Sequence, residues 1–131
     1  MLSDLFEALV ESLDLGHRVR FAGEVDDETL LDLYAGALAV VYPPFDEDFG
    51  YVTLEAFLAR KPVITCLDSG GPNEFVIDRV NGRSVEASAD SLAEAINFIA
   101  ADRGRAARLG DAGRLRAQEI TWDGVIEKLV P

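Results

Sequence analysis

The sequence predicts an α/β fold in which helices cover both faces of a doubly wound parallel sheet. Short apolar runs alternate along the chain with segments whose apolar residues recur at helical spacing. Two of these runs, 38–44 (LAVVYPP) and 61–67 (KPVITCL), are apolar nearly throughout, which is typical of strands buried on both faces. With 131 residues and 49% hydrophobic content, the chain is long enough for one domain, residues 1–131.

The first elements follow from local signals. Residues 3–16 place Leu5, Leu9 and Leu13 on one helical face, and Gly16 is expected to end this helix. Residues 18–23 (RVRFAG) predict a short strand. Asp26 is the expected N-cap of a helix over 28–37. Acidic residues in the first turn of that helix would interact favourably with the helix dipole.

The remaining elements continue the alternation. A helix is predicted over 51–60, a buried strand over 61–67, a glycine turn and short helix opened by Pro72, and a turn and strand over 80–86. Ser91 and Glu94 fit a capping box for a helix over 92–101. Two helical stretches should follow, broken near Gly110–Gly113 and again over 121–124.

Composition excludes some partners. The net charge of −12 argues against nucleic acid and against anionic membrane surfaces. No apolar run is long enough to span a bilayer, and no secretory signal pattern is present. Cys66 stands alone, so a cytoplasmic location is expected. The chain also lacks GxGxxG and GxxxxGK[ST] phosphate loops.

The stretch 43–57 (PPFDEDFGYVTLEAF) contains the main candidate residues for ligand binding. The helix after Gly50 points free N–H groups at the carboxyl edge of the sheet, where a diphosphate could bind. Glu47 and Glu55 would repel phosphates, but carboxylates accept hydrogen bonds from sugar hydroxyls. A sugar on each side of a diphosphate is a nucleotide sugar. Alternatively, neither glutamate binds a ligand: Glu47 is a solvated acid of a loop, and Glu55 is an ordinary acid on a helix surface.

Several motifs resemble those of the C-terminal domain of retaining, group 1 (family 4) glycosyltransferases of the GT-B fold, and they occur in the same order along the chain as in that family. They are the E-x7-E pair with FG between its glutamates, PVIT on the next strand, and GG-P-x-E followed by N-G, within a match over about residues 18–86. The resemblance implies a Rossmann-like domain that binds a nucleotide sugar. It makes Glu47 the catalytic residue beside the donor sugar and Glu55 the ribose ligand. Further donor contacts are then expected at Phe49, Gly50, Tyr51, Val52 and Thr53.

Weaker candidates keep their alternatives. The resemblance places Val25, Asp26 and Asp27 where family members contact the nucleotide base, although Asp26 and Asp27 also suit helix capping. Gly70 and Gly71 could contact the ligand or only turn the chain. Asp46 and Asp48 have DxD spacing but are expected to be solvated, so no metal or other cofactor is expected beside the donor substrate.

The resemblance also implies missing parts. The acceptor-binding N-terminal domain and the first strands of this domain are absent, and with them the family's diphosphate-binding Arg and Lys. We therefore expect this chain alone to be inactive, although the parent reaction is retaining sugar transfer to an acceptor. Open sheet edges suggest a homodimer or a rearranged strand order. The alternatives are a non-catalytic nucleotide-sugar-binding or interaction module, and another GT-B-like enzyme such as an epimerase.

Overall fold

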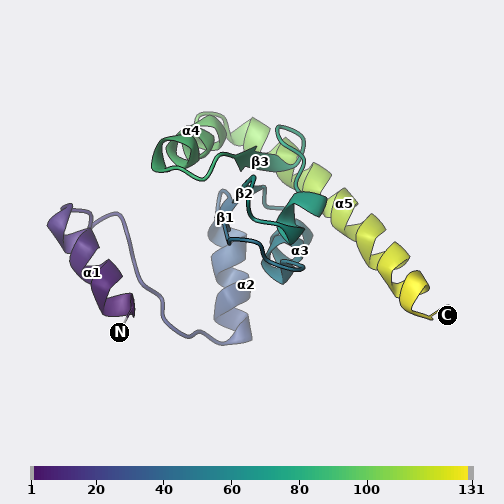
Figure 1. Ribbon diagram of the computed structural model, residues 1–131, viewed down its shortest axis with the longest axis horizontal. Coiled ribbons are helices and arrows are strands. Elements are labelled where there is room, and N and C mark those ends of the chain that lie inside the picture. Colours follow the sequence, from purple (N-terminus) through teal and green to yellow (C-terminus); the bar gives the residue numbers. More distant parts are fainter. Residues whose placement is uncertain (1, 130–131) are drawn as a thin grey trace. The chain divides into compact units, whose positions relative to one another are not determined.

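The computed structural model describes residues 2–129, with side chains from residue 4 to residue 120. Its elements are α1 (Leu2–Ser12), α2 (Asp27–Gly36), β1 (Val40–Val41), α3 (Tyr51–Leu58), β2 (Val63–Cys66), the 3-10 helix η1 (Gly71–Glu74), β3 (Gly82–Val85), α4 (Ala89–Ala100) and α5 (Arg103–Leu129) (Figure 1). The chain divides into two compact units, one up to residue 30 and one from residue 31 onward. Helix α2 crosses this division.

The first unit contains α1 and the segment that leads to α2. The helix predicted over 3–16 is confirmed, although it ends at Ser12. The strand predicted over 18–23 is wrong, because these residues form no strand. A strand needs a neighbour for its backbone groups, but the backbone bonds described for this segment are local: Arg18 and Val19 both donate to the Leu15 carbonyl.

The second unit is built on a parallel sheet with the order β1-β2-β3. Val40 pairs with Val63 of β2, and Val63 pairs in turn with Gly82 of β3. All four residues of β2 are buried, as expected for 61–67. The expectation that 38–44 would be buried on both faces is wrong, because β1 is a short edge strand and Val41 is 46% exposed.

Each face of β2 packs against its own core. Val63 belongs to a cluster with Ala56, Phe57, Phe75, Val76 and Ala117, which α3, the segment around η1 and the later turns of α5 supply. Ile64, on the opposite face, belongs to a cluster with Val85, Ala95, Ile99, Ala106 and Leu109, mainly from α4 and the first turns of α5. Successive strand residues point to opposite faces. The prediction of a parallel sheet covered on both faces is therefore confirmed.

Helix α5 is continuous where the sequence predicts two breaks, near Gly110–Gly113 and over 121–124. The two glycines serve packing. A Cβ at Gly110 would collide with the Arg60 carbonyl, and one at Gly113 would lie 2.5 Å from the Phe57 ring. Glycine is therefore required for the close approach of α5 to α3, and this requirement outweighs its weak helix propensity.

The two predicted helix caps have different outcomes. Oδ1 of Asp26 accepts a hydrogen bond of 2.8 Å from the Thr29 N–H, so the cap of α2 is confirmed. The capping box at Ser91 and Glu94 is wrong. Helix α4 begins one turn earlier, and Oγ of Ser88 accepts the hydrogen bond from the Ser91 N–H. Both serines suit a cap, and only Ser88 has the extended backbone that a cap adopts.

Among the helices described for this chain, none is both long and apolar enough to cross a membrane.

Candidate functional site

Two loops lie side by side beyond the carboxyl ends of β1 and β2. We call residues 43–50 the glutamate loop and residues 67–71 the glycine loop. The backbone N–H of Asp46 donates to Asp68 O at 2.9 Å, and that of Glu47 donates to Ser69 O at 2.8 Å. In return, the Gly71 N–H donates to Glu47 O at 2.6 Å. These bonds extend the parallel pairing of the sheet, so the Glu47 backbone is fixed although its side chain is exposed.

The glycines of the glycine loop allow this contact. A Cβ on Gly70 would lie 2.7 Å from the Glu47 carbonyl oxygen, and one on Gly71 would collide with the Asp48 carbonyl. Gly70 also has a φ of +80°, a conformation that side chains disfavour. Both glycines therefore hold the glutamate loop in place. A direct ligand contact of Gly70 or Gly71 stays a prediction.

Gly50 opens α3 in the left-handed conformation, with φ 79° and ψ 59°. A Cβ there would lie 2.9 Å from Cγ of Pro72, the proline of η1, so glycine is required by conformation and by space. No side chain caps the first turn of α3. Within this turn the Thr53 N–H donates to the Gly50 carbonyl at 3.0 Å. Among the described residues, the N–H groups of Tyr51 and Val52 therefore remain open, with the positive end of the helix dipole, to an anion at the edge of the sheet.

Glu55 lies one turn into α3 and is held by Tyr34 of α2. The Tyr34 hydroxyl donates a hydrogen bond of 2.9 Å to Oε2 of Glu55. Burial, together with this carboxylate, raises the pKa of Tyr34 to about 12. The phenol therefore stays protonated at neutral pH and remains a donor. Oε1 of Glu55 has no hydrogen-bond partner among the described residues and can accept from a ligand hydroxyl.

An aromatic cluster contains Phe49 and Tyr51, which lie between the two glutamates in the sequence, and Phe75. The Phe49 ring centroid is 4.6 Å from that of Tyr51 and 5.3 Å from that of Phe75, with tilted and edge-on geometries. Such pairs fix ring orientation. Phe75 is buried, Phe49 is partly exposed and Tyr51 is two-thirds exposed, so the cluster reaches from the core to the surface next to the open end of α3.

The other predicted residues of α3 face inward. Val52 is half-buried, and Thr53 is fully buried. Oγ1 of Thr53 has no hydrogen-bond partner. An expected donor contact of Val52 would therefore run through its backbone N–H, whereas the Thr53 N–H already donates to the Gly50 carbonyl, and a donor contact of Thr53 stays a prediction.

The predicted base contacts, Val25 and Asp27, lie in the first compact unit, and both stay predictions. Their neighbour Asp26 has an established structural role. Its hydrogen bonds from Thr29 lower the pKa of its carboxyl group, as expected for an N-cap. The capping interpretation therefore holds for Asp26.

Sequence reasoning missed Tyr34 and Phe75 as parts of the site. Both residues are spaced as core positions, and Tyr34 indeed packs at the edge of the Val63 cluster. A buried tyrosine needs a partner for its hydroxyl, which was the available signal, but its partner lies 21 residues away in the sequence. Within the described residues, no group of His, Cys, Asp or Glu side chains is arranged to hold a metal ion.

Known proteins resemble this chain in sequence. The family described as "Glycosyl transferases group 1" matches residues 3–116. An uncharacterized glycosyltransferase of Methanocaldococcus jannaschii is 34% identical over 98% of this chain. The human alpha-1,3/1,6-mannosyltransferase ALG2 is 35% identical over 85% of it. These alignments cover 33% and 26% of the two relatives, so the chain spans about a third or less of their length.

Two solved structures superpose on nearly the whole of this chain. Sucrose-phosphate synthase from Thermosynechococcus elongatus superposes with a TM-score of 0.86 at 37% identity, over 95% of this chain and 31% of that one. Anabaena HepE, solved in complex with UDP and glucose, superposes with a TM-score of 0.81 at 27% identity, over 98% of this chain and 36% of its own.

Proposed function

Because the chain belongs to the group 1 glycosyl transferase family, we propose that it forms the donor-binding part of a retaining glycosyltransferase of the GT-B fold. The parent reaction transfers a sugar from a nucleotide diphosphate sugar to an acceptor. One arrangement carries this proposal: the uncapped N-terminus of α3 lies between the fixed glutamate loop and the tethered Glu55.

Each part of the donor has a chemically suitable counterpart. The open N–H groups of α3 suit a diphosphate, since they supply hydrogen bonds and positive potential without a charged side chain. Oε1 of Glu55 suits the vicinal hydroxyls of a ribose, because a carboxylate accepts strong hydrogen bonds. Glu47 would then act beside the donor sugar and the reaction centre. The UDP and glucose in HepE support a nucleotide sugar as the ligand class.

A second candidate function is binding without catalysis. From Phe21 to Ala59 the sequence contains no lysine or arginine. The leaving diphosphate gains negative charge in the transition state, and fixed cations are the usual means to stabilise it. The N–H groups at the start of α3 can bind the diphosphate of the intact donor. They carry only partial charges, so they stabilise the leaving diphosphate less than fixed cations would. We therefore expect this chain alone to bind donor and to turn it over slowly or not at all.

Calorimetric titration with UDP, GDP and ADP tests the donor site. One nucleotide should bind, and Glu55→Ala should weaken its binding by about 1–3 kcal/mol, since a charged hydrogen-bond acceptor is lost. Glu119→Ala, on α5, removes the same charge from an exposed position and should leave binding unchanged. Nucleotide binding that Glu55→Ala leaves intact would refute the assigned ribose contact.

Assay of UDP-glucose hydrolysis by the same chain separates the two functions. Saturable donor binding without sugar release supports the non-catalytic interpretation for this chain. Release that Glu47→Gln abolishes would show that the chain carries catalytic competence by itself.

A further inference from the structure

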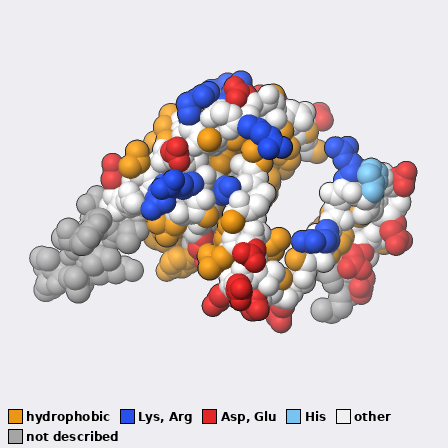
Figure 2. Space-filling model, turned by 180° about the vertical axis from the view of Figure 1, so that it is seen from behind, with side chains coloured by type: hydrophobic (Ala, Val, Ile, Leu, Met, Phe, Trp, Pro, Cys, Tyr) orange, Lys and Arg blue, Asp and Glu red, His pale blue; other side chains and the backbone are white. Residues whose placement is uncertain are grey.

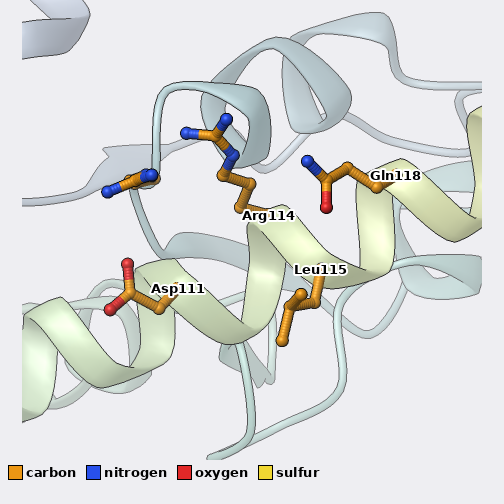
Figure 3. Close-up of a pocket in the computed structure, with 5 residues that line it drawn as sticks. Asp111, Arg114, Leu115 and Gln118 are labelled. Carbon is orange, nitrogen blue, oxygen red and sulfur yellow. The ribbon is translucent and has the colours of Figure 1, made fainter.

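An open groove with a volume of about 410 Å³ lies between the carboxyl end of α3 and helix α5. Arg60, Asp111, Arg114, Leu115 and Gln118 line it. The spacing of 111, 114 and 118 places these three side chains along one face of α5. Figure 3 shows Arg114 and Gln118 reaching into the same space above α5, with Asp111 one turn earlier. Polar and charged groups of both signs therefore surround one hollow.

The guanidinium groups of Arg60 and Arg114, which line the groove, have no hydrogen-bond or ion-pair partner among the described residues. Arg116 on the same helix is different, because it donates to the Glu74 carbonyl and pairs with Glu119. Two unpaired guanidinium groups that line one groove repel each other. A bound oxyanion would relieve this repulsion and accept several N–H bonds.

Arg60 occupies a backbone conformation that favours glycine, with a φ of 62° just after the end of α3. Its N–H donates to the Phe57 carbonyl and the Lys61 N–H donates to the Ala56 carbonyl, both at 2.9 Å. These two bonds are the usual means of ending a helix at a left-handed residue. The arginine side chain is therefore not needed to terminate α3. A non-glycine residue is uncommon in this conformation, and here it places the Arg60 side chain in the lining of the groove.

We propose that this groove is a second binding site that takes a sugar phosphate. Arg60 and Arg114 hold the phosphate through paired N–H bonds, and Asp111 and Gln118 hydrogen-bond the sugar hydroxyls. Lys61 and Arg103 line an adjoining cavity that shares Arg60 and Asp111, and they add positive potential. Figure 2 shows Lys and Arg side chains spread over one face of the second unit, although the chain as a whole is strongly acidic.

This site is separate from the donor site. Arg60 follows the carboxyl end of α3, whereas the open N–H groups lie at its other end, after Gly50. An eight-residue helix is about 12 Å long. The proposal therefore does not depend on the function proposed for Glu47 and Glu55, and each can fail without the other.

Titration of the chain with glucose 6-phosphate, followed by amide NMR shifts and calorimetry, tests the proposal. Glucose 6-phosphate should bind saturably and more tightly than inorganic phosphate, and glucose alone should not bind. Arg60→Gly and Arg114→Ala should each weaken binding by roughly tenfold or more, because each removes charged hydrogen bonds. Arg60→Gly suits the local backbone, so its melting temperature should equal or exceed that of the parent chain.

Two variants serve as controls. Arg108→Ala removes the same charge from α5 outside the groove, and Glu55→Ala alters only the donor site; both should leave glucose 6-phosphate binding unchanged. The proposal is overturned by an absence of saturation at about 10 mM ligand, or by equal losses in Arg108→Ala and Arg60→Gly. Inorganic phosphate that binds as tightly as glucose 6-phosphate would overturn the assignment of a sugar phosphate.

Discussion

The hydroxyl of Tyr34 on α2 donates a 2.9 Å hydrogen bond to Oε2 of Glu55 on α3. This bond joins two helices that β1 and the glutamate loop separate in the sequence. It occupies one carboxylate oxygen and leaves the other for a ligand. A glutamate on an exposed helix surface ordinarily samples several rotamers, so the hydrogen bond from Tyr34 favours one orientation of the Glu55 carboxylate, and the proposed donor would find it already formed.

Tyr34→Phe should therefore weaken nucleotide binding. Loss of one hydrogen bond to the carboxylate corresponds to about 0.5–1.5 kcal/mol, or roughly two- to tenfold in Kd. Calorimetric titration with the nucleotide that the parent chain binds measures this change. Tyr42→Phe removes a hydroxyl from a half-buried position outside the tether and should bind like the parent chain. Equal affinity of Tyr34→Phe and the parent chain would show that Tyr34 does not position Glu55.

The same tyrosine predicts a dependence of stability on pH in the alkaline range. Burial and the Glu55 carboxylate raise the pKa of Tyr34 from 10.0 to about 12. Between these values the unfolded chain releases the phenolic proton while the folded chain retains it. The stabilisation is complete below the lower value and is lost as pH rises toward the upper one. The stability difference between the parent chain and Tyr34→Phe should therefore shrink across this range.

Urea unfolding of both proteins at intervals from about pH 9 to about pH 12 provides the measurement. A difference that stays constant across this range would mean that the folded-state pKa of Tyr34 is not raised.

The packing of α5 on α3 predicts opposite effects for two glycines of one helix. Gly110→Ala should destabilise the protein by about 1–3 kcal/mol, since the new Cβ collides with the Arg60 carbonyl. Gly104→Ala should be neutral or stabilising by up to about 1 kcal/mol, because a Cβ there meets only the ends of the flexible Asp102 and Arg108 side chains. Denaturant unfolding compares the two variants. Similar effects in both would contradict the packing role of Gly110.

The position of the α4 cap predicts which serine stabilises that helix. Ser88→Ala should cost about 1 kcal/mol of unfolding free energy, because its hydroxyl accepts the bond from the Ser91 N–H. Ser91→Ala should have little effect, since only the backbone of Ser91 takes part in that cap. Thermal unfolding of the two variants tests the assignment. A larger loss in Ser91→Ala would restore the cap expected from the sequence.

Four features could be predicted from the sequence: the alternation of helices and strands, the buried strand over 61–67, the N-cap at Asp26 and the family. These features depend on apolar periodicity, on residue types with strong local preferences and on an ordered set of motifs, and the chain carries all three. The acids Glu47 and Glu55 were likewise visible from their spacing around Phe49 and Gly50. Local signals fail where two residues are equally suitable, as Ser88 and Ser91 were for the cap of α4.

Tertiary structure alone decided the rest. Gly110 and Gly113 predict a break when they are read locally, and only the neighbouring α3 shows that a Cβ has no room there. The residues of 18–23 suit a strand, but the backbone bonds described for this segment are local, from Arg18 and Val19 to the Leu15 carbonyl. The tether between Tyr34 and Glu55 and the groove at Arg60 join residues far apart in the sequence. Such contacts depend on how the elements pack, which no local pattern encodes.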